Sequence, residues 1–230
     1  MGDNLEDIRI KAQKIKESPA DILELRADYY EGDMVEDLSA VFLALRENFD
    51  GELIFTYRSD KNGKFGKLTP DRVVLLLKNA AIQKADYIDV EYGLLKDYPN
   101  LVKELRDAAI ILSEHVYTGP YSADYIYNRL KELSEYNADV LKYVIMPDTK
   151  HDVMQLMEGV IRYKEEYPDR YVIAHAMGEI GLISRLSAEL IGSEVAFAAL
   201  DEESAPGQID VDTMKACLDT IHEQLVSGEN

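Results

Sequence analysis

The chain has 230 residues, of which 44 are Asp or Glu and only 25 are Lys or Arg, so its formal charge at neutral pH is −19. Such a charge repels nucleic-acid phosphates and anionic lipid, and the sequence contains no segregated basic cluster. Apolar residues make up 47% of the chain, which is enough for a sizeable core and excludes a mostly disordered protein. We therefore expect a folded protein that binds neither nucleic acid nor membranes.

The cysteine content and the start of the chain indicate a compartment. Cys217 is the single cysteine, which excludes an intramolecular disulfide framework and a cysteine-based metal cluster. No apolar run approaches the roughly 20 residues that span a bilayer. The acidic first residues lack the pattern of a secretory signal. Together these features predict a protein of the reducing cytoplasm.

Short apolar runs alternate with amphipathic stretches along the whole chain. The first stretch, from about Asn4 to Glu17, predicts a helix that Asn4 caps, with Asp7 three residues later. Seven runs rich in Val, Ile or Tyr follow, and their near-continuous apolar character is typical of parallel strands buried on both faces. These predicted strands are Asp21–Ala27, Glu52–Arg58, Asp86–Glu91, Ala109–Ser113, Val140–Met146, Arg170–Ala176 and Glu194–Leu200.

Helical patterns with apolar residues three and four positions apart lie between the strands. They cover residues 35–45, 73–81, 126–133, 153–161 and 214–225. Repeated strand–helix units without a linker predict a parallel α/β fold, and we favour a single (β/α)₈ barrel domain over residues 1–230. A dinucleotide-binding open sheet is disfavoured because no Gly-x-Gly-x-x-Gly follows the first strand. Since only seven strands are predicted, the first barrel strand is expected to be missing from this chain.

In a parallel barrel, reactive groups gather at the carboxyl ends of the strands. Lys142 lies inside the apolar strand Val140–Met146, where burial disfavours the charged ammonium. A neutral amine forms a Schiff base with a ketone. The alternative, which this strand alone favours, is a lysine whose stem packs on the wall while its head reaches solvent. His115 is either a hydrogen-bonded structural residue or a proton carrier near neutral pH.

Two arginines also stand at strand ends. A guanidinium fork suits a carboxylate ligand, and side chains converge where Arg26 and Arg58 end their strands. Glu24 shares a strand face with Arg26, so we expect Glu24 to orient that arginine. The alternative is that Arg26, Arg58 and Arg185 each form an ordinary ion pair with an acidic neighbour such as Asp60.

The sequence gives little indication of a metal site. The four histidines, at 115, 151, 175 and 222, share no ligand spacing, so we expect no metal. An Mg²⁺ site at Asp89 and Glu91, on one strand face, stays open as a minor alternative.

The run Ser204–Gln208 contains Pro-Gly, which favours a plain turn. Its polar groups are otherwise suited to a polyhydroxylated ligand.

Seven short motifs occur in a fixed order over about residues 20–215. They are ILELRAD at 22–28, FTYR at 55–58, IDVE at 88–91, SEH at 113–115, KYVIMP at 142–147, MG at 177–178 with ISR at 183–185, and SAPGQI at 204–209. In this order they resemble type I 3-dehydroquinate dehydratase. Most are weak individually, but the last motif together with His115 and Lys142 is specific.

The resemblance implies a barrel enzyme that removes water from 3-dehydroquinate to give 3-dehydroshikimate, in the shikimate route to aromatic amino acids. It implies no metal, no dissociable cofactor and a homodimer. It assigns Lys142 as the Schiff-base lysine, His115 as the general acid and base, and Arg185 as the partner of the substrate carboxylate. The further substrate contacts and pocket walls that it implies are Glu24, Arg26, Arg58, Ser204, Gln208, Met177 and Phe197.

The chain departs from the family's pattern at two places besides the missing strand. Asn62 stands where the family commonly has a glutamate paired with the catalytic histidine, so Asp89 is an alternative partner for His115. His175 and Ala176 replace the more usual Met-Ser lead into the Met-Gly motif, which brings an extra imidazole near the pocket. That imidazole either shifts the pH profile or is inert.

Two other functions stay open beside the dehydratase. A class I aldolase shares the strand-borne lysine, but the run after the seventh predicted strand is acidic (Asp201–Glu203) rather than phosphate-binding. A catalytically silent barrel that senses a carboxylate metabolite keeps the arginines and does not need both Lys142 and His115.

Overall fold

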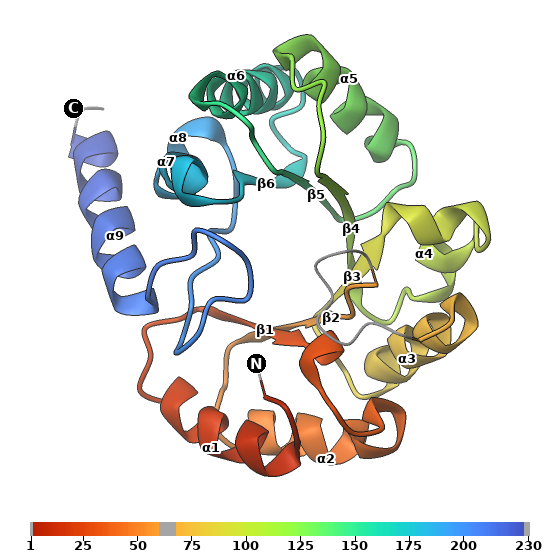
Figure 1. The fold of residues 1–230 in the computed structure, drawn as a ribbon. Coiled ribbons are helices and arrows are strands. Elements are labelled where there is room, and N and C mark those ends of the chain that lie inside the picture. The colour runs from red at the N-terminus through yellow and green to blue at the C-terminus, as the bar shows by residue number, and fades with distance from the viewer. Residues whose placement is uncertain (1, 60–67, 228–230) are drawn as a thin grey trace. The chain divides into compact units, whose positions relative to one another are not determined.

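The computed structural model describes residues 2–59 and 68–227, which form two compact units, Met1–Ile111 and Leu112–Asn230. Along the chain, strands alternate with helices, as Figure 1 shows. Within each unit, strands that are neighbours in the chain are neighbours in the sheet, and every strand pair with a defined register is parallel. The predicted parallel α/β fold is confirmed.

The first unit alternates three strands with helices on its described residues. Its elements are α1 (Leu5–Ile15), β1 (Ile22–Arg26), η1 (Ala27–Tyr29), α2 (Met34–Arg46), β2 (Glu52–Thr56), α3 (Pro70–Ile82), β3 (Tyr87–Glu91), η2 (Tyr92–Lys96), α4 (Leu101–Glu104) and the start of β4 (Ala109–Val116). Helices α1 and α2 pack on each other outside β1 and β2 (Figure 1).

Helix α1 begins where the sequence predicts. The side chain of Asn4 accepts a hydrogen bond of 3.0 Å from the backbone N–H of Asp7, which confirms Asn4 as the N-cap. The carboxylate of Asp7 accepts from the backbone N–H of Asp3 at 3.1 Å. The Asp7 side chain therefore binds the backbone of the residue before the cap and stabilises the same helix start. Ile8, Ala12 and Ile15 form its buried stripe.

The register of the first three strands brings polar residues together. Arg26 is paired with Thr56 across β1 and β2, and Thr56 is paired with Asp89 across β2 and β3. Residues paired in this way point to the same face of a sheet. Arg26, Thr56 and Asp89 therefore form a row near the carboxyl ends of their strands, and each of them is buried.

The second unit is built in the same way. Its elements are the end of β4, α5 (Ala123–Ser134), β5 (Val140–Ile145), α6 (Lys150–Glu166), β6 (Tyr171–Ala176), η3 (Glu179–Gly181), α7 (Leu182–Leu186), α8 (Ala188–Ile191) and α9 (Val211–Ser227). Helices α5 and α6 lie side by side (Figure 1). Their contact needs Gly159, because a Cβ there would come within 2.9 Å of Ile126.

The seventh predicted strand, Glu194–Leu200, is wrong as a regular strand. Within the described part of this unit, Ala199 makes one isolated parallel bridge to Asp210, and residues 193–198 have no regular structure. The backbone N–H of Glu194 bonds to Val172 of β6, and that of Ala199 bonds to Ile209. The run is rich in alanine, which has a low strand preference, and its bonds do not extend into a ladder.

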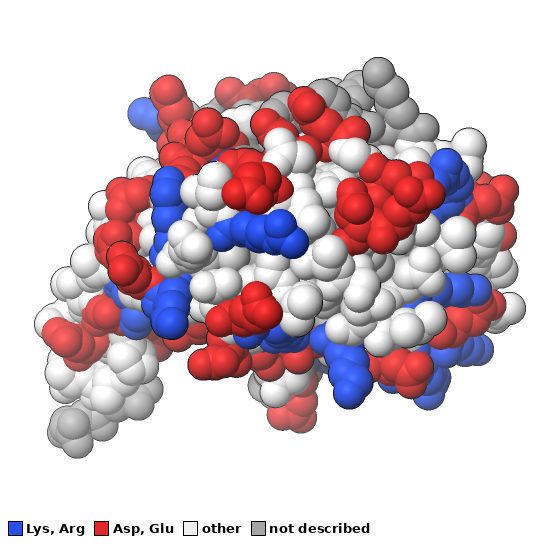
Figure 2. Space-filling view, turned by 90° about the horizontal axis from the view of Figure 1, so that it is seen from below, with Lys and Arg blue, Asp and Glu red and all other residues white. Residues whose placement is uncertain are grey.

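The surface carries the acidic excess of the sequence. On the face drawn in Figure 2, Asp and Glu side chains cover more area than Lys and Arg. Among the helices of residues 2–59 and 68–227, none is long and apolar enough to cross a bilayer.

Candidate functional site

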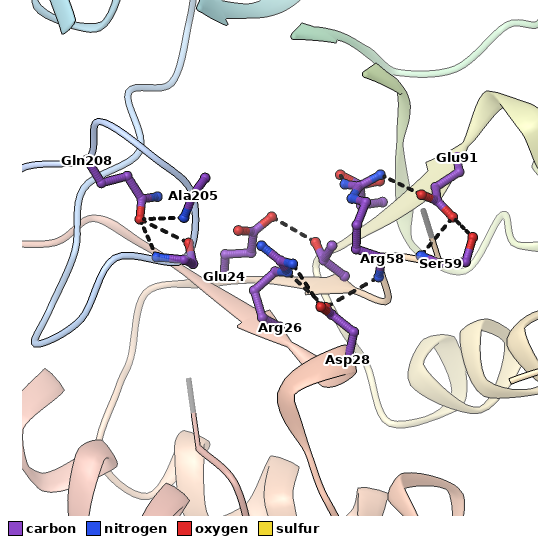
Figure 3. A network of polar contacts seen from close by, with 11 residues as sticks. Glu24, Arg26, Asp28, Arg58, Ser59, Glu91, Ala205 and Gln208 are labelled. Carbon is purple, nitrogen blue, oxygen red and sulfur yellow. Dashed lines mark hydrogen bonds and ion pairs between the residues drawn. The ribbon is translucent and has the colours of Figure 1, made fainter. Parts of the chain in front are cut away.

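A network of buried charges lies at the carboxyl ends of β1 to β3 (Figure 3). The Nε and Nη2 atoms of Arg26 each donate to a different carboxylate oxygen of Asp28, both at 2.8 Å. Asp28 lies in η1 directly after β1, and it also accepts from the backbone N–H of Arg58 at 3.3 Å. Burial of Arg26 opposes its charged form, but the hydrogen bonds and charge of Asp28 outweigh this and raise its pKa.

Arg58 is the centre of the second half of this network. Its Nη2 donates to Asp89 at 2.9 Å and its Nη1 donates to Glu91 at 3.2 Å. The other oxygen of Glu91 accepts from the backbone N–H and the hydroxyl of Ser59. Arg58 is 2% exposed and Asp89 is 1% exposed, so this ion pair is shielded from water. The carboxylates considered for Mg²⁺ thus both bind Arg58.

The hydrogen bonds of Arg26 and Glu24 involve residues that were not among the expected partners. Glu24 accepts a hydrogen bond of 2.8 Å from the hydroxyl of Thr56, and the bidentate partner of Arg26 is Asp28. The charge of Glu24 also acts on Arg26, and its role in orienting that arginine stays a prediction. The Arg-x-Asp spacing at the strand end was the signal for the pair of Arg26 and Asp28, since η1 turns the chain back toward the strand.

A hollow of about 510 Å³ lies beside this network in the first unit. Asp28, Tyr57 and Arg72 are on its wall, together with the start of α2. None of its described lining residues is a predicted site residue. Its acidic wall does not match a carboxylate ligand.

In the second unit, Lys142 lies on β5 and is 4% exposed, so it is buried as predicted. Its Nζ lies 4.4 Å from the centre of the Phe197 ring. An amine over a ring face is favoured by the electron density of that face. The loop after α8 thus places Phe197 against the lysine head, and its role as an apolar pocket wall stays a prediction.

His175 and Arg185 belong to the same group of side chains. The His175 ring lies 5.6 Å from the Phe197 ring, and Nη1 of Arg185 donates to the Phe197 carbonyl at 3.5 Å. His175 pairs with Val144 across β5 and β6, so it shares a sheet face with Lys142. Burial, followed by the positive charges of Arg185, Lys142 and His115, lowers the pKa of His175 well below its usual value near 6.5.

The lowered pKa of His175 predicts a pH-dependent stability. The unfolded chain takes up a proton at this histidine below about pH 6.5, whereas the folded protein keeps it neutral. The folded state is therefore stabilised above that pH and loses this stability as the pH falls. The loss grows as the pH falls further below that value.

We expect the free energy of unfolding of His175→Met, measured in urea from pH 7 to pH 5, to fall less steeply with falling pH than that of the unchanged protein. His151→Met, which changes an exposed histidine at the start of α6, is the control for the loss of an imidazole. Equal slopes for all three proteins would contradict a neutral His175.

His115 lies near the end of β4 and is half-buried. Directly after it, the carbonyl of Val116, the last residue of β4, accepts from the backbone N–H of Met146 at 2.8 Å. The neighbouring Glu114 accepts two hydrogen bonds from Arg129 on α5, at 2.6 and 2.8 Å. Asn62, the position of the missing glutamate partner, lies outside the described residues, as does Asp60.

The run Ser204–Gln208 is a turn that its own side chains organise (Figure 3). The side-chain oxygen of Gln208 accepts from the backbone N–H and hydroxyl of Ser204 and from the backbone N–H of Ala205, at 2.7, 3.0 and 3.3 Å. The turn contacts the end of β6, because Pro206 accepts from Gly178 at 3.0 Å.

The same contact explains why a glycine is needed in this turn. Gly207 has a φ of +79°, and a Cβ there would lie 2.3 Å from the Gly178 carbonyl oxygen. Gly178 directly follows Met177, a buried predicted pocket residue whose backbone N–H donates to the Ile145 carbonyl of β5 at 2.8 Å. The turn is therefore tied to the strands that carry Lys142 and His175.

Among residues 2–59 and 68–227, no group of three or more His, Cys, Asp or Glu side chains is placed to share a metal ion. In the second unit, the side chains described above offer a buried primary amine, two imidazoles and a buried guanidinium. A buried amine reacts with a carbonyl, and a guanidinium binds a carboxylate.

The fold and this group of residues define a parallel α/β protein with a strand-borne lysine beside a buried arginine. Comparison with known proteins identifies the family. The sequence profile of type I 3-dehydroquinase matches residues 1–225, and the chain belongs to this family.

Individual relatives agree with this assignment. The 3-dehydroquinate dehydratase of Salmonella agona is 34% identical, over 97% of this chain and 91% of that protein. A structure of the type I 3-dehydroquinate dehydratase of Clostridium difficile with covalently modified comenic acid has a TM-score of 0.89 at 30% identity, covering 97% of this chain and 90% of that one. The 3-dehydroquinate dehydratase of Geobacillus kaustophilus has a TM-score of 0.90 at 26% identity, covering 96% and 88%.

Proposed function

We propose that the chain is a lyase that dehydrates 3-dehydroquinate to 3-dehydroshikimate through a Schiff base at Lys142. Membership of the type I 3-dehydroquinase family supports the overall reaction. The observation that carries the mechanism is the burial of Lys142 on β5, with its amine against Phe197 and with Arg185 in the same group of side chains. We further propose that residues 1–230 act as one catalytic domain.

In the first step the neutral amine of Lys142 attacks the substrate ketone. A carbon–nitrogen double bond replaces the carbonyl, one proton is taken up from solvent and one water leaves, so the product is a positively charged iminium. The position of Lys142 supports this step, because its amine is buried inside the second unit against the ring of Phe197. The iminium withdraws electrons from the neighbouring carbon, and the hydrogen on that carbon becomes acidic enough to be removed.

His115 is the proposed base for that hydrogen. Imidazole gains and loses a proton close to neutral pH, so His115 accepts the proton as the enamine forms and then donates it to the departing hydroxyl. The hydroxyl leaves as water, which makes the double bond of the product. A second water then hydrolyses the iminium, and this releases 3-dehydroshikimate and restores Lys142.

Arg185 is the proposed partner of the substrate carboxylate. It is 1% exposed, and a buried guanidinium binds a carboxylate more strongly than an exposed one does. Fixing the carboxylate sets the distance between the ketone and Lys142, and such positioning contributes several kcal/mol to catalysis. Glu24, Arg26, Arg58, Ser204 and Gln208 remain predicted substrate contacts, with Met177 and Phe197 as predicted walls.

Trapping of the intermediate tests the proposal. The protein is incubated with 3-dehydroquinate, reduced with borohydride and weighed, and the absorbance of the conjugated product is followed in an unreduced sample. We expect a covalent adduct on the peptide that contains Lys142 and an increase in that absorbance. An adduct on another lysine, or neither adduct nor product, contradicts the proposal. An adduct at Lys142 without product contradicts the dehydration, and binding with neither adduct nor product is the result expected of a silent carboxylate sensor.

His115→Ala separates proton transfer from imine formation. Loss of the acid–base group is expected to lower kcat by about 10²–10⁴-fold, while the borohydride adduct at Lys142 still forms. The measurements are steady-state turnover and the mass of the reduced protein. Glu114→Gln, which changes the neighbouring residue that hydrogen-bonds to Arg129, is the control and keeps kcat within a few-fold. Full activity of the alanine variant would refute the role of His115.

A further inference from the structure

We infer that His175 contacts the substrate directly: its neutral ring forms a hydrogen bond with a hydroxyl group of the ligand bound at Lys142. This inference rests on the proposed function for the identity of the ligand. No family motif quoted above contains this residue. The argument comes from the position of the ring, from the state of its Nδ1 atom and from the charges around it.

The ring is placed where a ligand of Lys142 reaches it. β5 and β6 pair in parallel, with Lys142 opposite Ile173 and Val144 opposite His175, so the two side chains project from the same face of adjacent strands. Phe197 contacts both of them, at 4.4 Å from the lysine nitrogen and 5.6 Å from the imidazole ring. A six-membered ring attached to Lys142 therefore lies within reach of His175.

The imidazole is not explained by packing. His175 is 6% exposed, and its Nδ1 atom is buried without a hydrogen-bond partner among the described residues. A buried polar atom without a partner lowers stability, and an apolar side chain of similar size avoids that cost. Because no protein group holds Nδ1, the tautomer is not fixed either. The ring is therefore able to present a donor or an acceptor to a hydroxyl group.

The charges around the ring favour a neutral contact. Arg185, Lys142 and His115 all act on His175 as positive neighbours. The Schiff base itself carries a positive charge at Lys142, and a further cation at His175 would oppose its formation. A neutral imidazole binds a hydroxyl without this repulsion. Arg185 remains the proposed partner of the substrate carboxylate, and His175 forms a hydrogen bond with an uncharged hydroxyl of the same ligand.

Four variants test the contact. His175→Met removes the ring nitrogens and keeps an apolar side chain of similar volume. His175→Asn places an amide near the position of Nδ1, and His175→Gln places one near the position of Nε2. His151→Met is the matched control on an exposed histidine. Thermal unfolding without ligand is measured for all four, so that a loss of folding is separated from a loss of binding.

We expect His175→Met to raise KM for 3-dehydroquinate about tenfold with kcat within about threefold, because a contact present throughout the reaction contributes to binding uniformly. One of the two amide variants is expected to restore most of the affinity. The melting temperature of His175→Met is expected to equal or exceed that of the unchanged protein. An unchanged KM, or failure of both amides to improve on methionine, overturns the inference.

A binding measurement separates this inference from the proposed reaction. In the Lys142→Ala background, calorimetry with 3-dehydroquinate is expected to show a Kd about tenfold weaker after His175→Met. If the unchanged protein shows no dehydration but this difference in Kd appears, the contact stands and the proposed reaction falls. If turnover is normal and Kd and KM do not respond to His175→Met, the proposed reaction stands and the contact falls. No binding at all also overturns the contact.

Discussion

Lys142→Ala is expected to abolish turnover of 3-dehydroquinate, with a loss of about 10⁴-fold or more. The reason is that the proposed reaction has no other route to an electron sink next to the ketone. Some ligand binding should remain, because Arg185 is unchanged. The measurement combines the absorbance of the conjugated product with the mass of the borohydride-treated protein, which should stay that of the free protein.

Two further variants test whether the loss of activity in Lys142→Ala is due to the loss of the nucleophilic amine. Lys142→Arg keeps a positive charge but has no nucleophilic amine, so it should be as inactive as the alanine variant. Lys150→Ala, at the exposed start of α6, should keep full activity. Turnover of the arginine variant near the normal rate would show that charge alone is needed and would exclude the Schiff base.

Asp89→Ala is expected to lower the free energy of unfolding by about 3–5 kcal/mol. Asp89 is the partner of Arg58 at 2.9 Å, and both are almost completely buried. Removal of the carboxylate leaves a buried guanidinium with less compensation, which costs more than the net strength of the pair. Urea unfolding at neutral pH measures the loss.

An exposed ion pair of the same unit provides the comparison. Glu104 lies 2.7 Å from Lys78, with both side chains nearly half exposed, and Glu104→Ala should cost less than about 1 kcal/mol. Replacing both buried partners, with Arg58→Met and Asp89→Leu together, should recover most of the stability that Asp89→Ala loses. Equal losses for Asp89→Ala and Glu104→Ala would show that the Arg58 network does not stabilise the first unit.

The elements with strong periodicity were predictable. Five long helices lie over the five helical patterns, and six strands lie over six predicted runs, because burial on one helix face or both strand faces leaves a local pattern. The run Glu194–Leu200 was not predictable in this way. It is as apolar as a strand, but its hydrogen bonds depend on Val172 and Ile209, which are distant in sequence or follow it in a loop.

The sequence predicted which kinds of residue form the candidate site better than it predicted which residues bind one another there. The apolar strand around Lys142 predicted its burial, which the structure confirms. The partner of Arg26 is two residues away and had a visible spacing. The partners of Arg58 are more than 30 residues away, on β3, so only the pairing of β2 with β3 brings them together.

By itself, the sequence determined the alternation of strands and helices, the buried faces and the placement of a lysine among apolar neighbours. These features depend on interactions within a few residues and on the periods of helix and strand. Only the tertiary structure decided which carboxylates hold Arg58, that Phe197 contacts both Lys142 and His175, and that the ring of His175 keeps a buried nitrogen without a partner. Those outcomes depend on strand register and loop path, which join residues far apart in the chain.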